Sequence, residues 1–485
     1  MYPRIHKAQR ILHLLILVVL LIIGTPSPGT GQVSYHRVAP KIYVPFDPNR
    51  VKVLHRSDRL FIVEVPYGGY AFSPRISPFG DRITFVPGLS TFAFTSVFLE
   101  PVRGLKIPGD VAGAPAEIKG FSSSEFSADR QMRTIAFICD IEKRDPKQAE
   151  REICVVHSDG TGLRRLTRPL RKDESEHHHA AAPAISEDGG FIVYRRQYLG
   201  YLGTVRTDGT GLRILVHQAD GLTPVVLTRR AVFYKRGGQV WRANLDGTGE
   251  RQLTREPGEI GALTADLEGR KVAYVARESG KPSVLKVIDG GSGAVLMAIQ
   301  GVAKGDWERD QTLRLSGDGE RVLFSGLYRE KPGLYMVVLQ TKEVFEVSVG
   351  TRPGRSADLN ETGEIVIMTK EEGWPLALAF LPDETPPLVR VDAPKHGSTV
   401  EGEGVGVAIQ YRDRAVVSGV DPQTVKILLN GRDVSDRLER GPAQARGNLG
   451  KELLAEGENV LEVRVKDRAG NEARQVVRFQ FRPKR

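Results

Sequence analysis

The chain has 485 residues, of which 40% are apolar and 26% are charged, so it is too long for one ordinary core and too polar for a membrane-embedded protein. Its net charge of +10 comes from 69 basic and 59 acidic residues that alternate along most segments. This pattern predicts a mixed-charge surface and no nucleic-acid partner, because nucleic-acid binding needs a concentrated basic patch.

The N-terminal residues 1–31 have the features of a secretory signal peptide. The basic residues Arg4, Lys7 and Arg10 precede an apolar run at 11–23, and a stretch rich in Gly and Pro follows. A run of this length is typical of a signal peptide, whereas a transmembrane helix needs about 20 residues. We expect cleavage and export to the periplasm, the medium or the cell surface. An uncleaved segment that anchors the chain in the membrane is the alternative.

An internal repeat follows. The string Asp-Gly-Thr-Gly begins at Asp159, Asp208 and Asp246, each time after a strand-like run. A second element, a turn rich in Ser, Asp and Gly before an apolar strand, recurs about every 40–45 residues between 74 and 381, as at 183–194. The period predicts four strands per unit and a β-propeller of about seven blades, with six or eight as alternatives.

These paired elements resemble the TolB-type β-propeller repeat, one of the WD40-like repeats. The resemblance covers about residues 60–381 and implies a propeller over residues 32–381. We expect the unpartnered strand at 60–65 to complete the last blade. TolB proteins also carry an α/β domain before the propeller, for which this chain has too few residues. The resemblance implies little about activity, since such propellers serve many functions.

Two cysteines lie on strand-like runs that the stretch 142–151 joins as a hairpin. In an oxidising compartment, Cys139 and Cys154 on neighbouring antiparallel strands are expected to form a disulfide. A pair of small buried thiols is the alternative.

Two further candidates lie between blades. His177, His178 and His179 follow an acidic stretch and are a candidate zinc or manganese site, with an exposed polar loop as the alternative. Trp307, beside Asp306 in another loop, is a candidate for stacking on a sugar ligand.

The C-terminal region begins after a proline-containing linker at 382–387. Apolar and polar residues alternate with period two beyond it, as at 405–411 and 461–466, which predicts a β-sandwich over residues 388–485. Strings such as 467–471 resemble bacterial extracellular Ig-like modules, which act as spacers or adhesive units. Asp467 and Asn471 are either calcium ligands or hairpin-turn residues.

No Gly-x-Ser-x-Gly, Walker, His-Glu-x-x-His or Cys-x-x-Cys motif occurs. We therefore expect an all-β, exported, non-catalytic binding or scaffold protein without a cofactor. Its propeller face would meet an envelope or extracellular protein, or a glycan. A metal-assisted polysaccharide lyase or hydrolase acting at the propeller mouth is the alternative.

Overall fold

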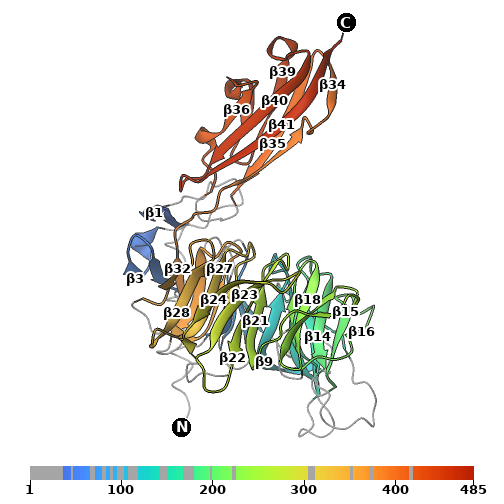
Figure 1. The fold of residues 1–485 in the computed structure, drawn as a ribbon, viewed down its shortest axis with the longest axis vertical. Coiled ribbons are helices and arrows are strands. Elements are labelled where there is room, and N and C mark those ends of the chain that lie inside the picture. The colour runs from blue at the N-terminus through green and yellow to red at the C-terminus, as the bar shows by residue number, and fades with distance from the viewer. Residues whose placement is uncertain are drawn as a thin grey trace, which may run out of the picture. The chain divides into compact units, whose positions relative to one another are not determined.

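A computed structural model of the chain is almost entirely β (Figure 1). His36–Arg485 form one compact unit, and the other unit, Met1–Tyr35, lies outside the described residues together with the expected signal peptide. No helix in the described ranges has both the length and the hydropathy needed to cross a membrane. The structure describes residues 36–44, 47–65, 71–78, 83–87, 91–95, 103–106, 118–141, 150–158, 160–167, 180–196, 199–220, 225–303, 312–349, 353–370, 376–413 and 419–484.

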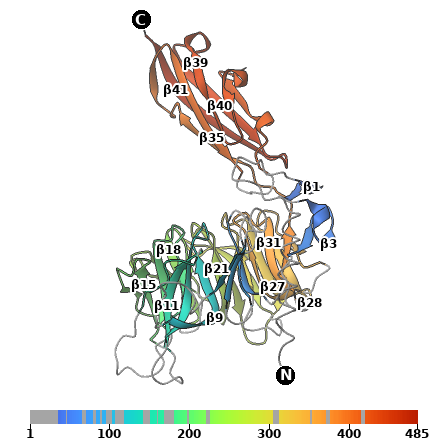
Figure 2. The same ribbon diagram turned by 180° about the vertical axis from the view of Figure 1, so that it is seen from behind.

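Five of the antiparallel sheets have four strands each and come from consecutive stretches of chain (Figures 1 and 2). In chain order they are β5 (Ala71–Ile76), β6 (Ile83–Pro87), β7 (Thr91–Thr95) and β8 (Arg103–Lys106); β9 (Ile118–Ala128), β10 (Thr134–Ile141), β11 (Glu150–His157) and β12 (Arg164–Arg165); β13 (Ala180–Ile185), β14 (Phe191–Arg196), β15 (Tyr201–Arg206) and β16 (Arg213–Val216); β17 (Val226–Leu227), β18 (Ala231–Arg236), β19 (Gln239–Asn244) and β20 (Arg251–Gln252); and β21 (Glu259–Ala265), β22 (Lys271–Arg277), β23 (Val284–Asp289) and β24 (Val295–Gln300).

Two five-stranded sheets follow. The first contains β25 (Val302–Ala303), β26 (Leu313–Leu315), β27 (Arg321–Tyr328), β28 (Lys331–Val338) and β29 (Glu343–Glu346). The second combines β3 (Val53–Arg56) and β4 (Phe61–Glu64) with β30 (Pro353–Leu359), β31 (Ile365–Lys370) and β32 (Leu376–Phe380). β4 pairs antiparallel with β32, so segments from both ends of this region share one sheet.

The first strands of successive sheets surround a common axis. Contacts run from β5 to β9, β13, β17, β21 and β26 in turn, and from β30 back to β5. The Ala357 N–H also donates to Thr312 Oγ1 across 3.0 Å, which links the last two sheets. This closed series of sheets is a β-propeller. We interpret each of the seven described sheets as one blade.

The repeated Asp-Gly-Thr-Gly string joins the third and fourth strands of a blade. In two copies, Asp208 and Asp246 accept hydrogen bonds from the Thr two residues later, and the Gly between them has φ of +88°. Arg164 and Arg213 donate to the backbone carbonyls of Asp208 and Asp246 in the next blade. The motif therefore builds turns and fastens neighbouring blades.

The C-terminal strands form two sheets around one core. One contains β33 (Leu388–Ala393), β35 (Gly404–Arg412), β38 (Glu439–Arg440) and β39 (Gln444–Gly450); the other contains β34 (Thr399–Gly402), β36 (Lys426–Leu429), β37 (Arg432–Asp433), β40 (Gly457–Lys466) and β41 (Glu472–Pro483). The predicted alternation is confirmed, because Val405, Val407 and Ile409 are buried and their neighbours are more exposed. The remaining elements are β1 (His36–Ala39), β2 (Ile42–Val44) and short 3-10 turns at Pro48–Arg50, Pro422–Thr424, Ser435–Arg437 and Lys451–Leu453.

Candidate functional site

The turns between the first and second strands of the blades meet around the propeller axis. We call the residue at the same place in each turn the mouth ring: Pro78, Arg130, Glu187, Arg229, Leu267, Gly317 and Glu361. Backbone hydrogen bonds connect neighbours in this ring, from Arg130 to Glu187, from Arg229 to Leu267 and from Glu361 to Pro78, each across 3.0 Å. These bonds join neighbouring turns of the ring in pairs.

Ion pairs brace the same ring. Arg130 donates to both Glu187 and Glu361, and Arg229 donates to both Glu187 and Glu268. Burial favours the neutral form of Glu187, but hydrogen bonds from Arg229 and Arg130 outweigh it and lower the pKa of this carboxyl. The Arg130 side chain, from the second blade, therefore reaches past the turn of the first blade to Glu361 in the last blade.

An open cleft of about 540 Å³ lies beside the ring. Arg133 at this cleft is exposed and makes no ion pair with any described residue. A preformed concave surface with several convergent polar groups is the usual form of a binding site. The lining residues are Arg130, Gln131, Arg133, Ser186, Glu187, Asp188, Phe191, Thr228, Arg229, Leu245 and Arg412.

A second layer of side chains lies three residues before the mouth ring on the first strands. We call it the axial layer: Arg75, Ser127, Ala184, Val226, Thr264, Arg314 and Asp358. In three places its side chains accept a backbone N–H from the next blade: Ser127 from Ile185, Thr264 from Leu315, and Asp358 from Ile76. These contacts show that the layer faces neighbouring first strands around the axis.

The axial layer carries more positive than negative charge. Arg314 Nε donates to Asp358 Oδ1 across 3.1 Å, while Asp358 Oδ2 accepts the Ile76 N–H across 3.2 Å. Among the described residues, Arg75 donates only to the backbone carbonyl of Pro74, at 3.3 Å, and it lies 5.8 Å from the Phe126 ring centre. Burial, followed by the like charge of Arg314 and partly opposed by the charge of Asp358, lowers the pKa of Arg75 to about 10, so the guanidinium stays charged at neutral pH.

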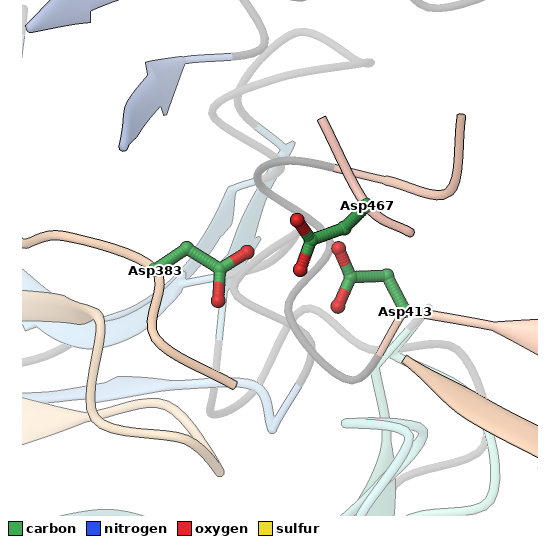
Figure 3. A group of neighbouring side chains, drawn as sticks. All are labelled: Asp383, Asp413 and Asp467. Atoms are coloured by element: carbon green, nitrogen blue, oxygen red, sulfur yellow. The ribbon is translucent and has the colours of Figure 1, made fainter. Parts of the chain in front are cut away.

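Three aspartates converge where the propeller chain leads into the sandwich. One oxygen from each of Asp383, Asp413 and Asp467 lies within 4.8 Å of the others, and their carboxyl groups point toward one another in Figure 3. Carboxylate oxygens at this spacing suit hard cations such as Ca²⁺. Burial, opposed by the Asn471 hydrogen bond and reinforced by the Asp383 charge, raises the pKa of Asp467 to about 6.

The surroundings of this group also have a structural explanation. Asp467 accepts two hydrogen bonds from Asn471, each across 2.8 Å, and the Asn471 side chain donates to the Asp383 carbonyl across 3.0 Å. Tyr43 also donates to the Arg468 carbonyl across 2.7 Å. Both residues of the expected calcium-or-turn pair thus make turn contacts and tie the turn to the propeller chain.

Of the residues singled out from the sequence, His177, His178, His179 and Trp307 lie outside the described residues. Cys139 and Cys154 lie on β10 and β11 and are joined by a disulfide, with their Cα atoms 5.8 Å apart. The sequence reasoning did not single out the mouth ring or the axial layer. Counting positions from each repeated turn would have found both sets.

No protein-family model matches the chain, and no curated protein matches it. Among solved structures, it is similar to an oligogalacturonate lyase from Vibrio parahaemolyticus, with 12% identity over 69% of this chain and 97% of that one and a TM-score of 0.49. It is also similar to an oligogalacturonate lyase in complex with manganese, with 14% identity over 68% of this chain and 79% of that one and a TM-score of 0.35. A third similar structure is a putative TolB from Agrobacterium tumefaciens, with 14% identity over 50% of this chain and 91% of that one and a TM-score of 0.35.

Proposed function

We propose that this chain is an exported, non-catalytic binding or scaffold protein that presents its propeller mouth to a protein or glycan of the cell envelope. The observation that supports this proposal is the mouth ring, braced by hydrogen bonds and ion pairs, beside an open cleft. A surface already held in shape loses little conformational entropy on binding. The sandwich, which we assign to the Ig-like type, would act as a spacer or a second contact.

The test compares capture of envelope components by the full chain and two charge-reversal variants. Arg133→Glu changes an exposed residue at the cleft. Lys281→Glu is the control, because Lys281 is 66% exposed in the β22–β23 connection, at the opposite end of the strands from the mouth ring. We expect a component bound by the wild type to be retained by Lys281→Glu and lost by Arg133→Glu. Equal retention by both variants would contradict binding at the mouth.

The enzyme alternative has its own assay. The purified chain is incubated with acidic and neutral polysaccharides, with and without Mn²⁺ or Zn²⁺, and the release of new chain ends is followed over time. Cleavage that depends on the metal and disappears when His177–His179 are replaced by alanine would establish the alternative. No cleavage under any condition would favour the binding role.

A further inference from the structure

We propose that Arg75 and Arg314 form a binding position in the axial layer for the carboxylate of a small acidic ligand. This inference rests on the proposed binding function and specifies the ligand class. The two arginines lie on the first strands of the first and sixth blades, on either side of Asp358 in the last blade. The three residues therefore occupy consecutive positions around the axis.

Among the described residues, the single negative charge of Asp358 compensates only part of the charge of the two arginines. Asp358 uses one oxygen for Arg314 and the other for the Ile76 N–H, so both of its carboxylate oxygens are already engaged. Arg75 has no carboxylate within ion-pair distance in the described part of the chain, and its one hydrogen bond goes to the adjacent Pro74 carbonyl. Most of the donors of its guanidinium therefore have no partner in the part of the chain that the structure describes.

The geometry favours a carboxylate over a neutral group. A guanidinium presents parallel N–H donors in a planar fork that matches the two oxygens of a carboxylate. Arg75 is only partly exposed and the Arg314 side chain is 32% exposed, so solvent reaches both while each is partly desolvated. An anion at such a place is held more strongly than at a fully hydrated surface.

The mouth ring favours a small ligand over a large one. Three residues of strand separate the two layers, which corresponds to about 10 Å. Arg130 reaches from the second blade to Glu361 in the last blade, past the turn of the first blade. A group that passes this bridge toward Arg75 therefore has to be compact, such as a single sugar acid or one amino-acid carboxylate.

The test measures binding by calorimetry at low ionic strength, using the full chain and matched probes. D-glucuronate is compared with neutral D-glucose, and N-acetylglycine with N-acetylglycinamide. We expect at least one carboxylate to bind and its neutral counterpart not to bind. Binding of D-glucuronate would indicate a sugar acid as the ligand, and binding of N-acetylglycine would indicate an amino-acid carboxylate. Inorganic phosphate is a third probe. Binding of phosphate alone, or of no carboxylate, would overturn the proposal.

Three variants separate a binding role from a structural one. We expect Arg75→Gln to weaken carboxylate binding at least about tenfold, because it removes a charge-assisted hydrogen-bond pair. Arg230→Gln, at a 69% exposed arginine in the mouth-side turn of the fourth blade, should leave binding unchanged. Asp358→Asn should tighten binding, since it removes the one competing negative charge of the axial layer.

A gain of affinity in Asp358→Asn is informative even if Arg75→Gln fails to fold, because a purely structural role for Arg75 would not produce it. Weaker or unchanged binding in folded Asp358→Asn would overturn the proposal, as would equal loss in Arg75→Gln and Arg230→Gln. If Arg133→Glu still abolishes capture of envelope components while no carboxylate binds, only this inference fails and the proposed function stands.

Discussion

Arg196 and Glu152 form a doubly hydrogen-bonded ion pair in the propeller interior, with Nη1–Oε1 and Nη2–Oε2 distances of 3.1 and 3.0 Å. Both side chains are 1% exposed, and they join β14 of one blade to β11 of the blade before it. Thr167 also donates to Glu152, so the carboxylate accepts three hydrogen bonds from two side chains. The pair therefore adds a specific polar contact to the apolar packing between these two blades.

Removing one partner of this pair should destabilise the protein strongly. Arg196→Met leaves the Glu152 carboxylate buried without its counter-charge, which is expected to cost about 3–5 kcal/mol in the free energy of unfolding. Chemical denaturation measures the loss. Arg478→Met is the control, because Arg478 and Glu458 are each 56% exposed and such pairs contribute under about 1 kcal/mol. Similar losses in the two variants would show that the buried pair has no special role.

The disulfide between Cys139 and Cys154 should stabilise the second blade. It joins residues 15 positions apart, and loss of such a bond lowers the free energy of unfolding by about 2–4 kcal/mol. We expect the double variant Cys139→Ala/Cys154→Ala to unfold at a correspondingly lower denaturant concentration. Mass spectrometry after alkylation should find no free thiol in protein recovered from the cell envelope. Two alkylated thiols there would refute an oxidised pair.

The β4–β32 pairing should be essential to the last blade. Phe61 is fully buried and its ring lies 6.4 Å from that of Phe380, its partner across the two strands. Phe61→Ala is expected to cost about 3–5 kcal/mol, through lost burial and the remaining cavity. Val53→Ala, at a residue 42% exposed on β3, should change stability by no more than about 0.5 kcal/mol. Equal thermal shifts in both variants would contradict this role.

Asp467 should make stability depend on pH. Its pKa is raised to about 6 in the folded chain, so between about pH 4 and pH 6 the folded state binds more protons than the unfolded state. The free energy of unfolding should therefore fall as pH rises through this window, by on the order of 2–3 kcal/mol from this group. Asp467→Asn should reduce that dependence, measured by denaturation at several pH values. Asp436→Asn is the control, because Asp436 is 97% exposed. An unchanged pH profile in Asp467→Asn would refute the prediction.

Local features of the fold were predictable because each depends on residues close together in the chain. The alternation at Val405, Val407 and Ile409 follows from the two-residue period of a strand. The turns at Asp208 and Asp246 follow from short side chains beside glycines that adopt positive φ. The repeat of these local units was sufficient to indicate a propeller.

The candidate site was not predictable in the same way. Arg130 and Glu361 are 231 positions apart, and nothing in the residues around either one indicates the other. Likewise, the sequence pointed to His177–His179 by composition alone, while the charged residues of the mouth ring are spread singly over several repeats. Dispersed side chains give no motif.

The sequence by itself thus determined the strands, the turns and their repetition, since these arise from backbone preferences and short-range patterns. Only the tertiary structure decided which side chains meet around the axis. Equivalent positions of separate repeats become neighbours when the sheets close into a ring, and this closure depends on β4 pairing with β32 more than 300 residues later. The excess charge at Arg75, Arg314 and Asp358 is a property of that closed ring.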